Sequence, residues 1–168
     1  LEPGASVAAK QSPQGRIGVL ATPGTIQSKG YEVAIQKHRP EVKVFPLPAP
    51  LLVPLAEEGY TDGPVVDAVL SEYLPPLMAA GVDTLVLGCT HYPLLAPAIQ
   101  RWFAHRNHEV LIVDSARATA EVVADGLVLP PSDTRESLRI MVTDAGDRFR
   151  QIAGRFLEED VAIQEVDL

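Results

Sequence analysis

A single thiol with a histidine two residues later marks the most reactive position in the sequence. Cys89 is the only cysteine of the chain, and it lies in the run Gly88-Cys89-Thr90-His91-Tyr92-Pro93. Residues 84–87 before it predict a buried strand, and Pro93 with the apolar run after it predicts a helix. A thiol at the carboxyl end of a parallel strand lies where open α/β sheets place their ligands.

The residues around Cys89 leave three chemical uses open. A metal site needs three or four ligands, and the other histidines, at positions 38, 105 and 108, show no ligand spacing. Two of them, His105 and His108, lie at the polar end of a predicted helix, where we expect them to be solvated. A nucleophile needs an oxyanion hole and a residue that orients its base. The Thr90 N–H suits such a hole, but the pattern identifies no orienting residue.

The third use is proton transfer. A neighbouring histidinium or a helix N-terminus favours the thiolate form of a cysteine, although most lone cysteines are inert small apolar side chains. Proton abstraction from carbon also needs donors that hold a carboxylate as charge develops. Thr22 and Thr25, in a turn rich in hydroxyls that follows another predicted strand, suit that role. For Glu57, with Glu58 beside it, the default interpretation is a solvated acid on a helix face.

The elements that position these residues alternate between strand and helix, which predicts a parallel sheet and the α/β class. Gly88 allows a close approach of backbone at the end of the third strand, and Asp114-Ser115 is expected to cap a helix. The patterns predict strands at 16–21, 42–45, 82–87, 110–113, 138–142 and 161–166. They predict helices at 5–10, 26–38, 53–60, 65–80 (bent or interrupted at Pro75-Pro76), 95–105, 116–127 and 147–157.

Composition excludes several classes of protein. The 168 residues are enough for one domain with a real core. A net charge of −8 without a basic cluster argues against nucleic-acid binding, and no apolar run approaches the roughly 20 residues that span a bilayer. A single cysteine forms no internal disulfide, which fits a reducing cytoplasm.

The run Gly88-Cys89-Thr90-His91-Tyr92-Pro93-Leu94-Leu95 resembles the second catalytic motif of the glutamate racemases, members of the aspartate/glutamate racemase family. Related aspartate racemases usually lack His-Tyr-Pro after Cys-Thr. Further segments along essentially the whole chain are similar to the same family: Glu2-Pro3-Gly4-Ala5, residues 17–26, residues 50–57, Asp114-Ser115-Ala116 and the closing Val166-Asp167-Leu168.

The resemblance implies an enzyme that interconverts L- and D-glutamate without a cofactor or metal, by proton transfer between two cysteines on opposite faces of the substrate. Cys89 corresponds to the cysteine that deprotonates L-glutamate, and His91 to the residue that assists it. Thr90 and His91 correspond to substrate contacts, and Glu57 to an acid that supports the catalytic groups. Thr22 and Thr25 are expected, from their turn alone, to form the turn first and to contact the ligand second. The resemblance further implies a cytoplasmic homodimer that supplies D-glutamate for peptidoglycan.

The sequence departs from the family in one respect, because the motifs of the family's first half, including its Cys-Asn-Thr, are missing. We therefore expect a C-terminal part of a glutamate racemase. In such a part, residues 1–114 are a three-layer α/β domain with a parallel sheet, and residues 115–168 return to complete a similar first domain. The alternatives are a ligand-binding α/β module without catalysis and a Cys-His hydrolase.

Overall fold

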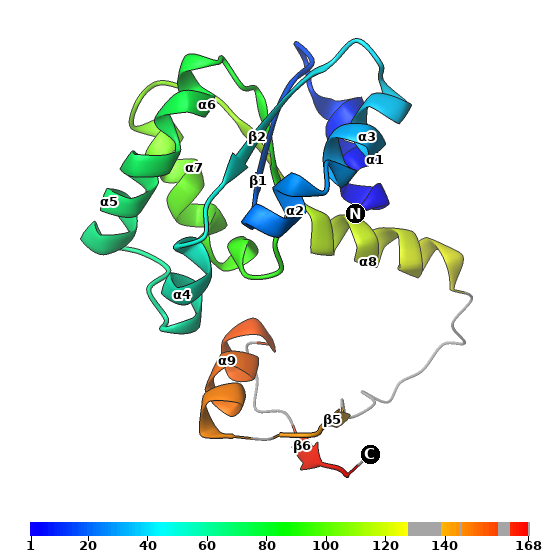
Figure 1. Cartoon of the computed structure of the whole chain (residues 1–168), viewed down its shortest axis with the longest axis vertical. Coiled ribbons are helices and arrows are strands. Elements are labelled where there is room, and N and C mark those ends of the chain that lie inside the picture. Colours follow the sequence, from blue (N-terminus) through cyan, green and yellow to red (C-terminus); the bar gives the residue numbers. More distant parts are fainter. Residues whose placement is uncertain (128–138, 145, 158–161, 168) are drawn as a thin grey trace. The chain divides into compact units, whose positions relative to one another are not determined.

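The computed structural model describes residues 1–127, 139–144, 146–157 and 162–167 (Figure 1). The chain divides into two compact units, Leu1–Leu127 and Val128–Leu168, and each is described by itself. In the described ranges no helix is both long enough and apolar enough to cross a bilayer.

A parallel four-stranded sheet forms the centre of the first unit, in the order β2-β1-β3-β4. Its strands are β1 (Arg16–Ala21), β2 (Lys43–Pro48), β3 (Thr84–Leu87) and β4 (Leu111–Asp114). Leu20 of β1 is in register with Leu87 of β3, which in turn is in register with Asp114 of β4. All carboxyl ends therefore meet at one edge of the sheet, and the parallel α/β prediction is confirmed.

Helices cover both faces of this sheet, as Figure 1 shows. One face carries α1 (Glu2–Gln11) and α3 (Gly30–His38), and the other carries α5 (Pro64–Tyr73), α6 (Pro75–Ala79) and α7 (Ala96–Ala104). Neighbouring strand residues point to opposite faces. Leu85 and Leu87 accordingly pack with the second group of helices, and Val86 packs with the first. Near-continuous apolar strands are typical of a sheet that is buried on both sides.

Three predicted helices differ from the observed ones for local reasons. The predicted helix 26–38 is two helices, α2 (Pro23–Gln27) and α3, because Lys29 between them has a positive φ of 53° that a helix cannot contain. Pro75-Pro76 divides the predicted helix 65–80 into α5 and α6, which is one of the two outcomes expected from these prolines. The turn after Cys89 continues into a 3₁₀ helix, η1 (Tyr92–Leu95), before α7 begins.

The strand β2 is longer than the predicted strand 42–45. It also contains Pro46 and Pro48, which lie opposite Val19 and Ala21. Proline is tolerated in this strand because β2 stands at the edge of the sheet, with β1 as its neighbour. After β2 the chain enters α4 (Leu52–Glu57), which ends at the acid of interest.

Helix α8 (Ser115–Gly126) begins at the end of β4, where Asp114 is its N-cap. The Asp114 carboxylate accepts hydrogen bonds from the N–H groups of Ala116 at 2.8 Å and Arg117 at 3.3 Å, as the sequence predicted. Helix α8 belongs to the first compact unit, Leu1–Leu127. The domain boundary at residue 114 concerns an intact racemase and stays a prediction.

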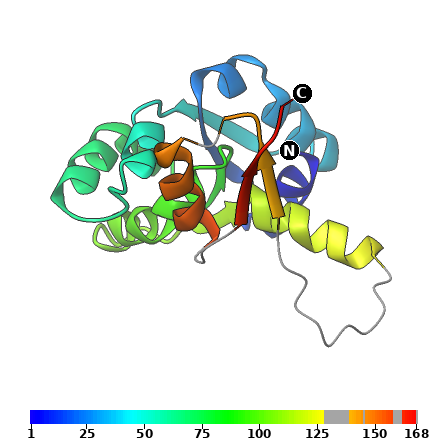
Figure 2. The same cartoon turned by 90° about the horizontal axis from the view of Figure 1, so that it is seen from below.

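The second unit contains β5 (Arg139–Val142), α9 (Asp147–Leu157) and β6 (Ala162–Glu165). The two strands pair in parallel with Arg139 opposite Ala162, and they lie side by side in Figure 2. The order strand–helix–strand agrees with the prediction for 138–166. Residue 138 and residue 161, at the predicted starts of these strands, lie outside the described residues.

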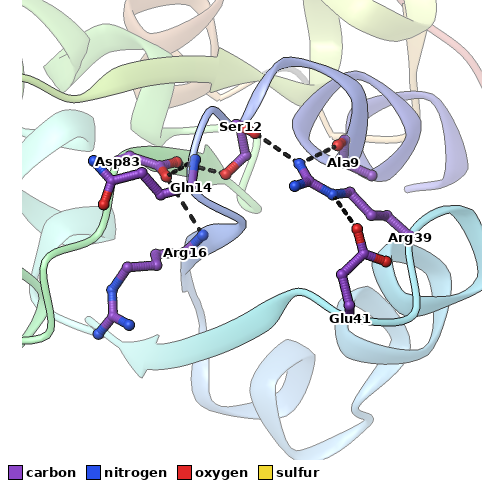
Figure 3. A network of polar contacts seen from close by, with 7 residues as sticks. All are labelled: Ala9, Ser12, Gln14, Arg16, Arg39, Glu41 and Asp83. Atoms are coloured by element: carbon purple, nitrogen blue, oxygen red, sulfur yellow. Dashed lines mark hydrogen bonds and ion pairs between the residues drawn. The ribbon is translucent and has the colours of Figure 1, made fainter.

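A carboxylate holds together the amino ends of β1 and β3, as Figure 3 shows. Asp83 accepts hydrogen bonds from the hydroxyls of Ser12 at 2.5 Å and Thr84 at 2.8 Å, and from the Gln14 N–H at 2.8 Å. Ser12 and Thr84 are almost fully buried, 3% and 0% exposed. Asp83 therefore supplies the partner that each of these buried hydroxyls needs.

Arg39 extends the same network to the end of α3 (Figure 3). Its guanidinium donates to the carbonyl oxygen of Ser12 at 2.7 Å and forms an ion pair with Glu41 at 2.7 Å. The whole network lies at the edge of the sheet opposite the one that carries Cys89, which leaves the carboxyl edge for chemistry.

Candidate active site

The sheet reverses its strand order between β1 and β3, and this point carries the candidate site. From β1 the chain moves outward to β2, then crosses back to β3 on the other side of β1. Open α/β sheets bind ligands at the carboxyl ends of the strands at such a switch point. Thr22 and the first turn of α2, which contains Thr25, follow β1 there, and the turn Gly88–His91 follows β3. The predicted turn at 22–25 is therefore the start of a helix.

His91 stands between Cys89 and an acid from another element. Its Nδ1 atom lies 3.9 Å from the Cys89 Sγ and 3.4 Å from the Thr90 Oγ1. On the other side of the ring, Nε2 lies 3.2 Å from the Glu57 Oε1 at the end of α4. The side chains of His91 and Glu57 are 23% and 27% exposed, so the pair is partly shielded from water but reachable.

This arrangement places Glu57 differently from the default interpretation. Glu58, just after α4, is exposed, but Glu57 is half-buried and faces the imidazole. A carboxylate on one ring nitrogen orients the imidazole and favours a proton on that nitrogen. The other nitrogen, Nδ1, then faces the thiol.

The two threonines of the β1 turn are placed at the same edge of the sheet. Leu20 and Leu87 are in register. Thr22 lies two residues after Leu20, and Cys89 lies two residues after Leu87, so both follow the same rung of the sheet. The Thr22 and Thr25 hydroxyls are 3.0 Å apart, and both residues are half-buried. Thr22 and Thr25 thus offer hydroxyl groups at the same edge of the sheet as the cysteine turn. This is the position that the sequence predicts for groups that hold a carboxylate.

Two buried tyrosines, which sequence reasoning did not single out as site residues, hold the cysteine turn. The Tyr92 hydroxyl donates to the Ala49 carbonyl oxygen at 2.7 Å, and Tyr92 is fully buried. The Tyr31 ring lies against Gly88, where a Cβ would be only 2.8 Å from its Cε2 atom. Gly88 is thus the close-approach position that the sequence predicted.

Burial keeps both phenols protonated. It raises the pKa of Tyr92 above the ordinary value of 10.0, and the nearby Cys89 raises it further. Burial likewise raises the pKa of Tyr31, with smaller contributions from Cys89 and Asp114 in the same direction. Each phenol therefore keeps its proton at neutral pH.

The remaining histidines lie elsewhere, and two of them have partners of their own. His108, predicted to be solvated, instead has its Nε2 atom 2.6 Å from the Val82 carbonyl oxygen, because the chain folds back from α7 towards β3. His38 pairs with Glu2 at 3.0 Å, and His105 is exposed after α7. Among the described residues, no three His, Cys, Asp or Glu side chains form a group that could hold a metal ion.

The fold and the site together define a doubly wound α/β domain with a thiol–imidazole–carboxylate set at its switch point. A model of the Asp/Glu/Hydantoin racemase family matches residues 1–123, and the chain belongs to this family.

Individual relatives agree with that assignment. The glutamate racemase of Geobacter metallireducens is 45% identical over 161 residues, which cover 94% of this chain and 58% of that protein. The glutamate racemase of Neisseria meningitidis serogroup C is 43% identical over 158 residues, 92% of this chain and 57% of that protein. The crystal structure of the Francisella tularensis enzyme in complex with D-glutamate superposes with a TM-score of 0.85 at 29% identity, covering 98% of this chain and 61% of that one. This chain therefore spans about three fifths of the length of the relatives it matches.

Proposed function

We propose that this chain supplies one of the two proton-transfer bases of a cofactor-independent glutamate racemase. The observation that carries the proposal is that the side chains of Cys89, His91 and Glu57 follow one another within contact distance at the switch point. The identity to glutamate racemases, and the D-glutamate complex of one of them, support glutamate as the substrate.

In the proposed reaction, the Cys89 thiolate accepts the α-proton of L-glutamate. The electron pair of the broken C–H bond moves into the α-carboxylate, which hydroxyls of Thr22, Thr25 and Thr90 are proposed to hold. His91, oriented by Glu57, accepts the thiol proton before the reaction and so leaves Cys89 as the thiolate that takes the α-proton. A second base on the opposite face delivers a proton to carbon and gives D-glutamate.

The second base is proposed to come from a part of the protein that this chain does not contain, since the chain has one cysteine. Within an intact racemase, residues 1–114 are proposed to form one domain and residues 115–168 to complete the other. We further propose that the intact enzyme is a cytoplasmic homodimer that provides D-glutamate for peptidoglycan, by its resemblance to the family.

A hybrid protein tests the proposal directly. In the hybrid, this chain replaces the matching segment of the Geobacter relative and follows that protein's own upstream part. Racemisation of glutamate is followed by circular dichroism. The hybrid is expected to interconvert the enantiomers, whereas the chain alone is expected not to. Racemisation by the chain alone would overturn the two-base proposal. A folded hybrid that binds glutamate without exchanging its α-proton with D₂O would favour a binding module instead.

A Cys-His hydrolase is the second candidate, because an acid, an imidazole and a thiol in this order also suit a nucleophile. Incubation with activated esters decides between the two functions. An acyl group that accumulates on Cys89, detected by mass spectrometry and released with turnover, would favour hydrolysis. Racemisation by the hybrid without any acylated chain would exclude it.

Replacement of Glu57 by glutamine in the hybrid is expected to lower kcat about tenfold, because a charge-assisted hydrogen bond to the imidazole becomes a neutral one. Glu58→Gln is the matched control, since it removes the same charge one residue later from an exposed side chain, and it is expected to leave kcat unchanged. Equal effects of the two substitutions would show that Glu57 acts only through the net charge of α4.

A further inference from the structure

Tyr31 reaches the cysteine turn from a different element and connects it to the start of α8. The residue lies in α3, is 6% exposed, and its ring fills the space beside Gly88. Its hydroxyl is 2.9 Å from the Ser115 Oγ at the first turn of α8. One side chain therefore contacts the residue before Cys89 and the residue after Asp114.

The contacts around Gly88 show why this side chain fixes the turn. The Gly88 N–H donates to the Leu20 carbonyl oxygen at 2.8 Å, which anchors it to β1. On its other side a Cβ would meet the Tyr31 ring at 2.8 Å and the Ala21 Cβ at 3.1 Å. Gly88 is thus held between a strand and an aromatic ring, and the position of that ring sets where the following residue stands.

Ser115 in turn is itself fixed. Its Oγ lies 2.5 Å from the place of a Cβ on Gly4, so α1 packs directly on it, and its carbonyl oxygen accepts a hydrogen bond from the Thr119 hydroxyl at 2.7 Å. The Tyr31 hydroxyl is therefore bonded to a short side chain that packs against α1 at the start of α8. This bond holds the far end of the ring whose edge lies against Gly88.

We propose that Tyr31 is a positioning residue for Cys89: anchored by Ser115, its ring holds Gly88 so that the thiol stays within reach of the His91 Nδ1 atom. Tyr31 acts through the turn and does not itself touch the substrate. The inference rests on the proposed role of Cys89 and His91, and it adds the residue that sets the distance between their side chains.

The rate of Cys89 alkylation by iodoacetamide in the 168-residue chain tests this idea without any racemisation assay. The thiolate is the species that reacts, so an imidazole in reach of the thiol at neutral pH raises the rate. His91→Gln is expected to lower the rate about fivefold, roughly the effect of one lost hydrogen bond. Tyr31→Phe, which keeps the ring and removes the anchor, and Ser115→Ala, which removes the same bond from its other end, are each expected to lower it several-fold.

Non-additivity separates positioning from a general loss of structure. In a chain that already carries His91→Gln, Tyr31→Phe is expected to change the alkylation rate little, because the contact that it protects is absent. Tyr60→Phe, on an exposed tyrosine, is the control for the loss of a phenol. Circular dichroism spectra check that every variant folds.

Two results would overturn the proposal. The first is an unchanged rate in Tyr31→Phe and Ser115→Ala while His91→Gln slows the reaction, which would leave the Cys89–His91 pair in place without a role for Tyr31. The second is an effect of Tyr31→Phe that is as large in the chain carrying His91→Gln as in the chain that retains His91, which would mean that Tyr31 supports the fold and not the pair. The proposed racemase function fails separately, through the hybrid.

Discussion

Racemisation by the hybrid protein is expected to fall about a thousandfold when Cys89 is replaced by serine, the range in which loss of a positioned proton-transfer group falls. A serine hydroxyl is a far weaker acid than a thiol and is not ionised beside His91. Binding of glutamate is expected to persist, because the threonine hydroxyls remain. Val33→Ala, on an exposed position, is the control and is expected to retain full activity.

Exchange of the α-proton in D₂O makes this prediction more specific. If Cys89 serves the L-enantiomer, Cys89→Ser abolishes exchange that starts from L-glutamate. The remaining base still removes and returns the α-proton of D-glutamate on its own face, so that exchange continues without inversion. Equal residual exchange from both enantiomers, followed by NMR, would contradict a two-base reaction in which Cys89 has one face.

The second large effect concerns the opposite edge of the sheet. Asp83→Ala is expected to lower the free energy of unfolding by about 3 kcal/mol, since it leaves buried hydroxyls without an acceptor. Ser12 and Thr84 both lose their carboxylate partner, and the Gln14 N–H loses a bond of 2.8 Å. Urea unfolding followed by the fluorescence of Trp102, the only tryptophan of the chain, measures the change.

Matched variants identify the cause of that loss. Asp125→Ala removes an exposed carboxylate from α8 and is expected to change the free energy of unfolding by less than about 0.5 kcal/mol, as is usual on a surface. Ser12→Ala combined with Asp83→Ala is expected to cost less than the sum of the single changes, because the orphaned hydroxyl is then absent. A simple sum would assign the loss to something other than the network.

The sequence was sufficient for those features that depend on a local pattern. The alternation of apolar runs with amphipathic segments predicts the parallel sheet, and the Gly88-Cys89-Thr90-His91 run predicts a reactive strand end. The Asp114 cap was likewise predictable, because an acid directly before a helix satisfies amides in its first turn.

The features that local patterns did not indicate depend on packing between distant segments. Only the family resemblance pointed to Glu57: its bond to His91 arises because α4 ends next to η1, and a helix-face acid with a second acid beside it carries no sign of that contact. Tyr31 shows only the spacing of an apolar helix position. Lys29 gives no warning that it adopts a left-handed conformation, since lysine has no preference for one.

The prolines of β2 have a consequence for the behaviour of the protein in concentrated solution. The N–H groups of Lys43 and Ala49 donate to Gly15 and Ala21 in and beside β1. In a strand, alternate residues direct their amides to opposite sides, so positions 46 and 48 direct theirs away from β1. Both of these positions are proline, which has no N–H to offer. A strand from another molecule that approaches this edge meets a template without donors at two successive sites, and the fold thereby resists the edge-to-edge pairing that begins aggregation.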